Sequence, residues 1–296
     1  MPKKKQKHKK RQNAAAVSRP ALVGAIICAV AAVALRMARH ARAEPLPRRL
    51  TRGMRVRRAR RAVPCRAASV CGARPCDRVV MDDWLPAHEI EALRGIARRG
   101  ADKAGAAAAQ GGPTIVDINS GFVMAPGARL ANLYQTKGVT PFSGEDYALY
   151  RSVIRRLKAE VEGAFPRASS LYFTAPTFLT WLSGENATWA PLEPHDEYYQ
   201  WHVDRDNTPH YEFSGLLYLS DYGADFGGGL FAFEDGTSIE PRRGRLSMFA
   251  AGAENRHRVA RVTRGQRLTL SFWFACDPAY EFADFLDGEV HAQFRS

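Results

Sequence analysis

Two segments place apolar residues three or four positions apart, the spacing of one face of a helix. The first follows Pro86, and proline is favoured at the start of a helix because its missing N–H needs no partner there. The second follows Ser143, whose hydroxyl can accept a hydrogen bond from the backbone of Asp146. The apolar faces are Ile90, Leu93, Ile96 and Ala97 in the first segment, and Tyr147, Tyr150, Val153, Ile154, Leu157 and Val161 in the second. The pattern therefore predicts two amphipathic helices ahead of Leu171.

From Leu171 onward the pattern changes to short runs rich in β-formers, separated by Gly, Asp and Pro. Runs of this length and spacing are typical of a sandwich or barrel. We therefore expect a mainly β protein with supporting helices, whose core is a double-stranded β-helix (jelly roll). The expected strands are 171–182, 198–204, 213–220, 229–234, 245–250, 257–263 and 266–275, with a surface loop at 100–113 and a close turn at 227–229.

The first 78 residues differ in composition from the rest. They hold 22 Lys and Arg against two acids, a net charge of +20, which leaves 21 basic and 28 acidic residues, or −7, for the remainder. A basic nucleic-acid-binding domain is therefore not expected, and we predict no nucleic-acid partner. We divide the chain into a basic tail at 1–19, a hydrophobic anchor or signal at 20–39, a basic linker or stalk at 40–78 and a folded domain at 79–296.

The apolar run 21–35 contains no polar side chain, which is typical of a membrane-insertion signal. We interpret 20–39 as a retained single-pass anchor, with the catalytic domain in the lumen of the endoplasmic reticulum or Golgi. A cleaved signal peptide also fits, and an Arg-rich, acid-poor start suits an organelle transit peptide as well. In an oxidising lumen Cys65, Cys71, Cys76 and Cys276 could form two disulfides, but their spacing gives no connectivity and unpaired thiols fit equally.

His202 and Asp204 lie two residues apart in an expected strand, so their side chains share one face. With one further histidine they would form the two-histidine, one-carboxylate triad that holds Fe(II) and leaves open positions for small ligands. His257 is the candidate third ligand. Ten residues later Arg267 begins a polar face, with Thr269 and Ser271, on an otherwise apolar strand. A buried arginine needs an anionic partner, which could be a carboxylate of 2-oxoglutarate.

Several motifs in fixed order resemble the prolyl 4-hydroxylase branch of the 2-oxoglutarate/Fe(II) oxygenases. They are Tyr199-x-x-His202-x-Asp204, then Leu217-Tyr218-Leu219-Ser220-Asp221, Phe226-Gly227-Gly228-Gly229-Leu230-Phe231, and His257-x-Val259-x-x-Val262-x-x-Gly265-x-Arg267. Within that branch the chain looks most like the membrane-anchored 2-oxoglutarate and iron-dependent oxygenase domain-containing proteins. The likeness covers about 79–278.

The resemblance implies that His202, Asp204 and His257 bind iron and that Arg267 binds 2-oxoglutarate. It also implies that Tyr218 and Thr269 assist Arg267, and that Tyr199 lies near the metal. The expected cofactors are Fe(2+), 2-oxoglutarate, O2 and L-ascorbate. The implied reaction hydroxylates a substrate, with a peptidyl and possibly prolyl residue as the target, and releases succinate and CO2.

Some features depart from the family pattern. His195 and Glu197 form a second same-face pair, and His210 follows, but none of these keeps the spacing to Tyr218 and Arg267. The segment 181–198 is an insert that could line the substrate groove or form a surface loop. The alternative functions are a non-catalytic membrane-tethered jelly-roll binding module and a zinc hydrolase, which would have no need of Arg267.

Overall fold

The computed structural model describes residues 43–66, 72, 76–105, 111–127, 129–135, 141–165, 170–174 and 177–282. The predicted tail and the predicted anchor at 20–39 lie outside these residues. No helix among the described residues is long and apolar enough to cross a membrane.

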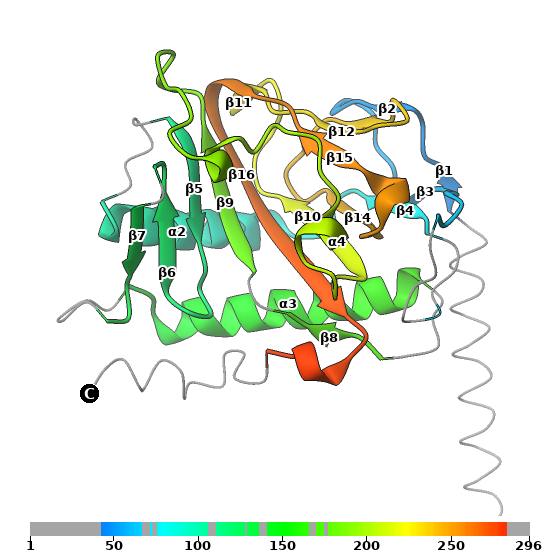
Figure 1. Cartoon of the computed structure of the whole chain (residues 1–296), viewed down its shortest axis with the longest axis horizontal. Helices are drawn as coiled ribbons and strands as arrows, with labels where there is room; N and C mark the ends of the chain where they lie inside the picture. Colours follow the sequence, from blue (N-terminus) through cyan, green and yellow to red (C-terminus); the bar gives the residue numbers. More distant parts are fainter. Residues whose placement is uncertain are drawn as a thin grey trace, which may run out of the picture. The chain divides into compact units, whose positions relative to one another are not determined.

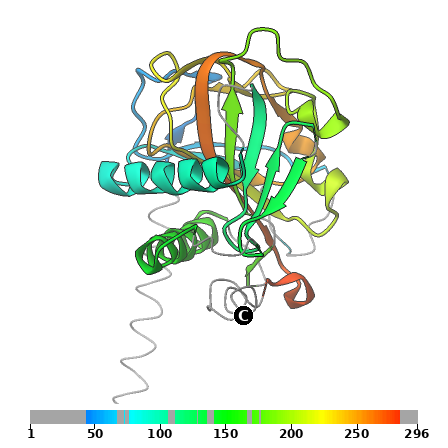
Figure 2. The ribbon, with the colours of Figure 1, turned by 90° about the vertical axis from the view of Figure 1, so that its left-hand side faces the viewer.

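Both predicted helices are present and bury the predicted faces. Helix α2 spans Ala87–Lys103 and buries Ile90, Leu93, Ile96 and Ala97. Helix α3 spans Gly144–Ala164 and begins with the expected capping box, in which Ser143 and Asp146 each accept the other's backbone N–H. The two helices cover the same side of the large sheet (Figure 2).

Two sheets form the β core, and the jelly-roll prediction is confirmed (Figure 1). The large sheet runs in the order β1-β3-β4-β14-β10-β16-β9-β5-β6-β7, and β8 and β11 also pair with β16. The small sheet runs β15-β12-β13-β2. The strands span Glu44–Pro45 (β1), Arg49–Leu50 (β2), Ala59–Arg61 (β3), Arg78–Met81 (β4), Gly112–Val116 (β5), Phe122–Ala125 (β6), Arg129–Asn132 (β7), Tyr172–Phe173 (β8), Phe178–Ser183 (β9), Phe213–Tyr218 (β10), Phe226–Gly228 (β11), Phe231–Phe233 (β12), Ser238–Ile239 (β13), Leu246–Ala250 (β14), His257–Val259 (β15) and Val262–Ala275 (β16).

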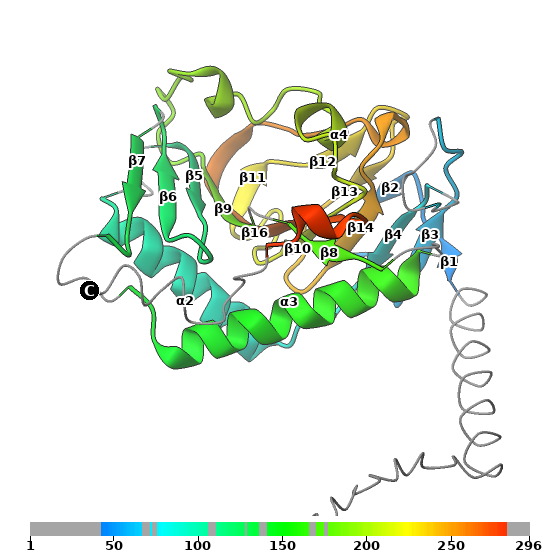
Figure 3. The same ribbon diagram turned by 60° about the horizontal axis from the view of Figure 1, so that its bottom comes forward.

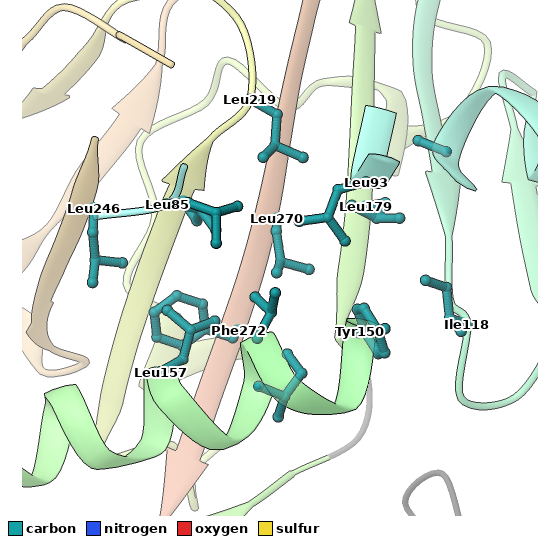
Figure 4. Packing of buried hydrophobic residues seen from close by; sticks show 14 of the residues in the cluster. Leu85, Leu93, Ile118, Tyr150, Leu157, Leu179, Leu219, Leu246, Leu270 and Phe272 are labelled. Atoms are coloured by element: carbon teal, nitrogen blue, oxygen red, sulfur yellow. The ribbon is translucent and has the colours of Figure 1, made fainter. Parts of the chain in front are cut away.

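The main apolar core lies between the large sheet and the two helices. Leu179, Leu270 and Phe272 from the sheet meet Tyr150 and Leu157 from α3 (Figure 4). A second cluster joins the two sheets and contains Leu50, Tyr218, Phe231, Ile239 and Phe249. Figure 3 shows the helices packed on one face of the large sheet, while α4 (Asp204–Asn207) and the chain before it lie on the other.

The linker prediction for residues 40–78 is wrong where the structure describes them. Strand β3 joins the large sheet beside β4, and β2 joins the small sheet beside β13. Leu46, Leu50, Val56 and Ala59 are buried, so the folded unit begins at Ala43 rather than Val79. These apolar residues are too irregularly spaced to show the period of a helix or a strand. Arginine also dominates the composition of the segment, so it resembles a solvated linker.

Two further expectations differ from the structure. The region 100–113, expected as a loop, contains the end of α2 and the start of β5. The hairpins β5–β6 and β6–β7, which the pattern did not predict, extend the large sheet beyond β9.

Two cystine bonds involve the predicted cysteines. Cys65 is bonded to Cys76 across 11 positions of the sequence. Cys276 is also disulfide-bonded.

Candidate metal and co-substrate site

His202 is held on the small sheet by a single bridge rather than by the strand expected at 198–204. Its N–H and C=O both pair with the backbone of His257, each at 3.0 Å. The chain then turns into α4, which begins at Asp204. The strand prediction is therefore wrong, because the turn after the bridge, not a shared strand face, brings the carboxylate beside both imidazoles.

Three possible ligand atoms converge at this point. Nε2 of His202 lies 3.7 Å from Oδ1 of Asp204, and Nε2 of His257 lies 3.8 Å from Oδ2. The two imidazole centroids are 4.4 Å apart. One ligand atom from each residue lies within 4.8 Å of the other two, and this is the only such group of three among the described residues. Separations of this size suit three ligands of one metal ion with bonds near 2 Å.

Both imidazoles are fixed by their other ring nitrogen. Nδ1 of His202 lies 3.0 Å from the carbonyl oxygen of Gln200, and Nδ1 of His257 lies 2.8 Å from that of Asn255. Each carbonyl can only accept, so each Nδ1 carries the proton and each Nε2 presents its lone pair to the metal position. Burial lowers the pKa of His257 to about 4, although Asp204 opposes this, so the ring is neutral near pH 7.

Arg267 is buried and incompletely paired. Its Nε donates to the carbonyl oxygen of Gly229 at 3.1 Å, and Nη1 donates to Oγ1 of Thr269 at 2.9 Å. Its guanidinium carbon lies 5.5 Å from the ring centre of Tyr218. Burial raises the pKa of the Tyr218 phenol to about 12, although Arg267 and Arg245 oppose the rise.

Two polar atoms in this cluster are left for a ligand. Nη2 of Arg267 and the Tyr218 hydroxyl are buried, and neither makes a hydrogen bond of ordinary geometry within the described residues. Burying a cation and a hydroxyl without acceptors for their hydrogen bonds costs free energy, and an anion that accepts these bonds removes the cost. A carboxylate fits both, because guanidinium and hydroxyl donors match its two oxygens.

The glycines after Phe226 allow the chain to approach this cluster. Gly228 has φ +72°, and a Cβ there would lie 2.2 Å from the backbone oxygen of Arg261. Gly229 has φ +62°, and a Cβ would lie 3.0 Å from Cδ of Arg267. Only glycine tolerates both the left-handed backbone and the contact. The expected close turn is present, with a bulge between Gly227 and Gly228.

The metal ligands and Arg267 line one cavity of about 360 Å³. Its wall is apolar around these groups, with Leu182, Phe231 and Val259 among the lining residues. A mainly apolar pocket with a few convergent polar groups is the usual form of a small-molecule site.

Of the two adjacent tyrosines, Tyr198 lines this cavity, whereas Tyr199, which was expected near the metal, is not among the lining residues. Tyr198 lines the cavity, and its hydroxyl accepts a hydrogen bond from the Val262 N–H at 3.0 Å. Tyr199 packs against Tyr198 and faces Arg261, with 5.8 Å between the Arg261 guanidinium carbon and its ring centre. In a helical or looped chain the two neighbours cannot be assigned by alternation, so the sequence did not distinguish them.

The insert 181–198 divides into two parts. Its first residues end β9, with Trp181 buried and Leu182 on the cavity wall. The remainder, which includes the short 3-10 helix η2 (Pro194–Asp196), is mostly exposed or half-buried, as expected for a surface loop, and Leu192 is 74% exposed. Its Trp189 stacks on Tyr198, which lines the cavity. Among the other candidate ligands, His210 stacks on Tyr280 at 4.0 Å and is not part of the metal group.

A jelly roll with a His-Asp-His metal site and an arginine in the same cavity defines a metal-dependent oxygenase. Residues 190–275 match the family model of the 2OG-Fe(II) oxygenase superfamily. The chain is 40% identical over 221 residues to the rat (Rattus norvegicus) 2-oxoglutarate and iron-dependent oxygenase domain-containing protein 3, covering 72% of this chain and 68% of that protein. The chain therefore belongs to the 2-oxoglutarate and iron-dependent oxygenase family.

Two more distant similarities carry less information. Prolyl 3-hydroxylase 2 of Rattus norvegicus is 39% identical over 97 residues, which cover 28% of this chain and 13% of that protein. A viral collagen prolyl hydroxylase from Paramecium Bursaria Chlorella virus-1 has a TM-score of 0.43 and 15% identity, covering 71% of this chain and 99% of that chain. A structural similarity with so low a TM-score supports no conclusion beyond the family membership that the sequence comparison shows.

The residues present fit the cofactors that the family uses, which are Fe(2+), 2-oxoglutarate and O2. Two neutral imidazoles and one carboxylate are the donor set of non-haem iron(II) sites. Nη2 of Arg267 and the Tyr218 hydroxyl, which make no hydrogen bond of ordinary geometry, fit a carboxylate of 2-oxoglutarate. The protein is accordingly a dioxygenase.

Proposed function

We propose that this dioxygenase hydroxylates a residue of a polypeptide, with proline as the first candidate, and converts 2-oxoglutarate to succinate and CO2. The observation that carries the proposal is that Asp204, both histidines and the buried, incompletely paired Arg267 line the same cavity. A metal site alone would also suit a hydrolase or a binding module. Neither of those alternatives needs a buried carboxylate-binding arginine beside the metal.

Each residue has a defined task in this reaction. His202, Asp204 and His257 hold the iron, and the carbonyls of Gln200 and Asn255 keep the imidazoles oriented. Bound iron(II) and 2-oxoglutarate together supply the activation of O2, with one oxygen atom entering succinate and the other entering the substrate.

Arg267 and its neighbours would orient the co-substrate. Arg267 and Tyr218 bind its distal carboxylate, and Thr269 holds the guanidinium in place through Nη1. Arg267 and Tyr218 are 2% and 0% exposed, so water screens their contact with a carboxylate only weakly. Arg267 is ionised throughout the working pH range, even though burial lowers its pKa.

A polypeptide substrate is supported by an apolar surface that continues outward from the cavity. Directly paired positions run across the large sheet from Tyr218 to Thr269, Thr180, Ile115, Met124 and Leu130. Cross-strand partners project from the same face of a sheet. Thr180 and Ile115 line the cavity, whereas Leu130 is 63% exposed at the far end. An extended chain lying along this row would reach the cavity that the metal ligands line.

The proposal also covers the cellular compartment in which the enzyme acts. A Cys65–Cys76 disulfide suits an oxidising compartment. We therefore retain a lumenal catalytic domain, anchored through residues 20–39 in the membrane of the endoplasmic reticulum or Golgi. L-Ascorbate is expected to keep the iron reduced.

The test is a peptide assay with the full chain. Peptides with a central proline, and the same peptides with alanine, are incubated with Fe(II), 2-oxoglutarate, ascorbate and isotopically labelled O2. Mass spectrometry should find one labelled oxygen atom in a proline peptide, and no labelling with Asp204→Ala. Labelling of alanine peptides alone would reject proline as the target, and 2-oxoglutarate turnover without labelling of any polypeptide would reject the polypeptide class.

A substitution of Leu130 tests whether the peptide substrate lies along this row of side chains. Leu130→Asp should raise the KM for the labelled peptide while leaving peptide-free 2-oxoglutarate turnover unchanged. Met54→Asp is the matched control, since Met54 is also exposed but does not lie in the paired row. Equal peptide KM values for the two variants would show that the row does not contact the substrate.

A further inference from the structure

The metal ligand His257 is supported by a buried polar cluster of two residues, Asn255 and Arg78, that do not line the cavity. Asn255, in the short turn before β15, is 1% exposed. Its backbone carbonyl is the group that accepts from Nδ1 of His257. The position of this one carbonyl therefore decides which way the imidazole faces.

Both N–H donors and the oxygen of the Asn255 side-chain amide are hydrogen-bonded. Its Nδ2 donates to the carbonyl oxygens of Cys76 at 3.1 Å and Ala250 at 2.8 Å, and its Oδ1 accepts from Nε of Arg78 at 2.7 Å. A buried amide bonded in this way permits essentially one backbone position, since any shift would leave buried partners unpaired. These three bonds tie the turn to β14 and to the chain that enters β4.

Arg78 completes the cluster. Its Nη1 donates to both carboxylate oxygens of Asp235, each at 2.9 Å, and Nη2 donates to the carbonyl oxygen of Glu254 at 3.2 Å. The guanidinium lies 3.7 Å above the ring centre of Phe233, and that ring in turn packs on His257. Arg78 thus contacts the turn through Glu254 and Asn255, and the imidazole through Phe233.

The same cluster is anchored by a disulfide. Cys76 supplies one of the carbonyls that bind Asn255 and is bonded through Sγ to Cys65. The metal site is thereby connected to the N-terminal segment 43–66, which belongs to the fold although its composition suggested a linker.

We infer that Asn255, held by Arg78 and by the Cys76 carbonyl, is the positioning residue for His257 and so sets the metal affinity of the site. Asn255 does not touch the metal. It fixes the carbonyl that keeps the proton on Nδ1, and this leaves the Nε2 lone pair directed at Asp204 and His202. The inference rests on the proposed function, because it takes the triad to be the iron site.

The experiment measures metal binding directly, with Co²⁺ as a coloured probe in the full chain. Asn255→Ala should raise the Co²⁺ dissociation constant about 10- to 100-fold, as loss of groups that orient ligands usually does. The ligand-field bands of the bound Co²⁺ should also shift, since one imidazole is reoriented. At saturating Mn²⁺ the 2-oxoglutarate dissociation constant should stay within about twofold of wild type, because Arg267 is untouched.

A second pair of variants separates positioning from stability. Arg78→Lys keeps the charge but loses the fork that binds Asn255 and Asp235 together. Arg245→Lys is the matched control, because Arg245 is equally buried and paired with Asp82 but has no contact with Asn255 or His257. Only Arg78→Lys should weaken Co²⁺ binding, and this comparison decides the matter if Asn255→Ala does not fold.

The outcomes are distinct. Unchanged Co²⁺ affinity in folded Asn255→Ala, or equal weakening in the two lysine variants, overturns the positioning role. Absence of divalent-metal binding by the folded wild-type chain instead overturns the proposed function.

Discussion

Leu50 provides a sharp test of whether the arginine-rich segment belongs to the folded unit. Its side chain is 0% exposed and lies in the cluster between the two sheets, with Tyr218 and Phe249. Leu50 pairs with Ile239 of β13, and its carbonyl accepts from the N–H of Glu240. Truncation of a fully buried leucine to alanine removes apolar contact and leaves a cavity, at a cost of about 2–5 kcal/mol. For a domain of this size that corresponds to roughly 4–20 °C in Tm.

Urea unfolding followed by circular dichroism measures the effect of Leu50→Ala. Leu192→Ala is the control, because Leu192 is 74% exposed and its truncation should change the free energy of unfolding by at most about 0.5 kcal/mol. If the segment were only a stalk, the two variants would behave alike. A change below about 0.5 kcal/mol for Leu50→Ala would refute its burial in the fold.

Three further predictions concern 2-oxoglutarate binding by Arg267, the carboxylate of Asp235 and the Cys65–Cys76 disulfide. Arg267→Gln should weaken 2-oxoglutarate binding roughly 10- to 150-fold in calorimetry, the equivalent of about 1.5–3 kcal/mol for a lost charge-assisted pair; unchanged affinity would show that another group binds the carboxylate. Burial raises the pKa of Asp235, but hydrogen bonds from Thr237 and Arg78 outweigh it and lower the pKa to about 2. The contribution of Asp235 to stability is present above the unfolded pKa of about 4 and is lost as the pH falls through about 2. In wild type the urea midpoint should therefore fall between pH 4 and 2, and Asp235→Asn should make this fall smaller. An equal fall in the two proteins would contradict the prediction. Replacing Cys65 and Cys76 together by serine should lower the free energy of unfolding by about 2–4 kcal/mol, and equal urea midpoints would rule out a stabilising bond.

The candidate site could be predicted because the intervals in the sequence between its residues match those of a known family. His257 and Arg267 lie on β15 and β16, which are consecutive in the sequence but belong to different sheets. The alternation after Arg267 placed Thr269 correctly beside it. The route by which Asp204 reaches the metal could not be predicted, since a two-residue spacing fits both a strand and the observed turn. Tyr199 was expected near the metal from the family resemblance, whereas Tyr198 lines the cavity.

The N-terminal part of the fold was missed because its stabilising contacts are distant in sequence. Its arginines form ion pairs with acids of the remaining folded domain, among them Arg49 with Glu240, Arg58 with Glu160 and Arg61 with Asp235. A run of unpaired arginines would remain solvated, and composition alone cannot show that partners exist nearly 200 positions away. Arg245 gives the reverse example, as its buried side chain donates to the backbone carbonyls of Thr51 and Met54.

Release of labelled CO2 from 2-oxoglutarate tests the central claim most directly. The full chain is incubated with Fe(II) and ascorbate, and Asp204→Ala is compared with Asp206→Ala, an exposed carboxylate on the same short helix. We expect release by wild type and by Asp206→Ala, and none by Asp204→Ala. Equal release by Asp204→Ala and wild type, or no 2-oxoglutarate binding by folded, iron-loaded wild type, would contradict the account.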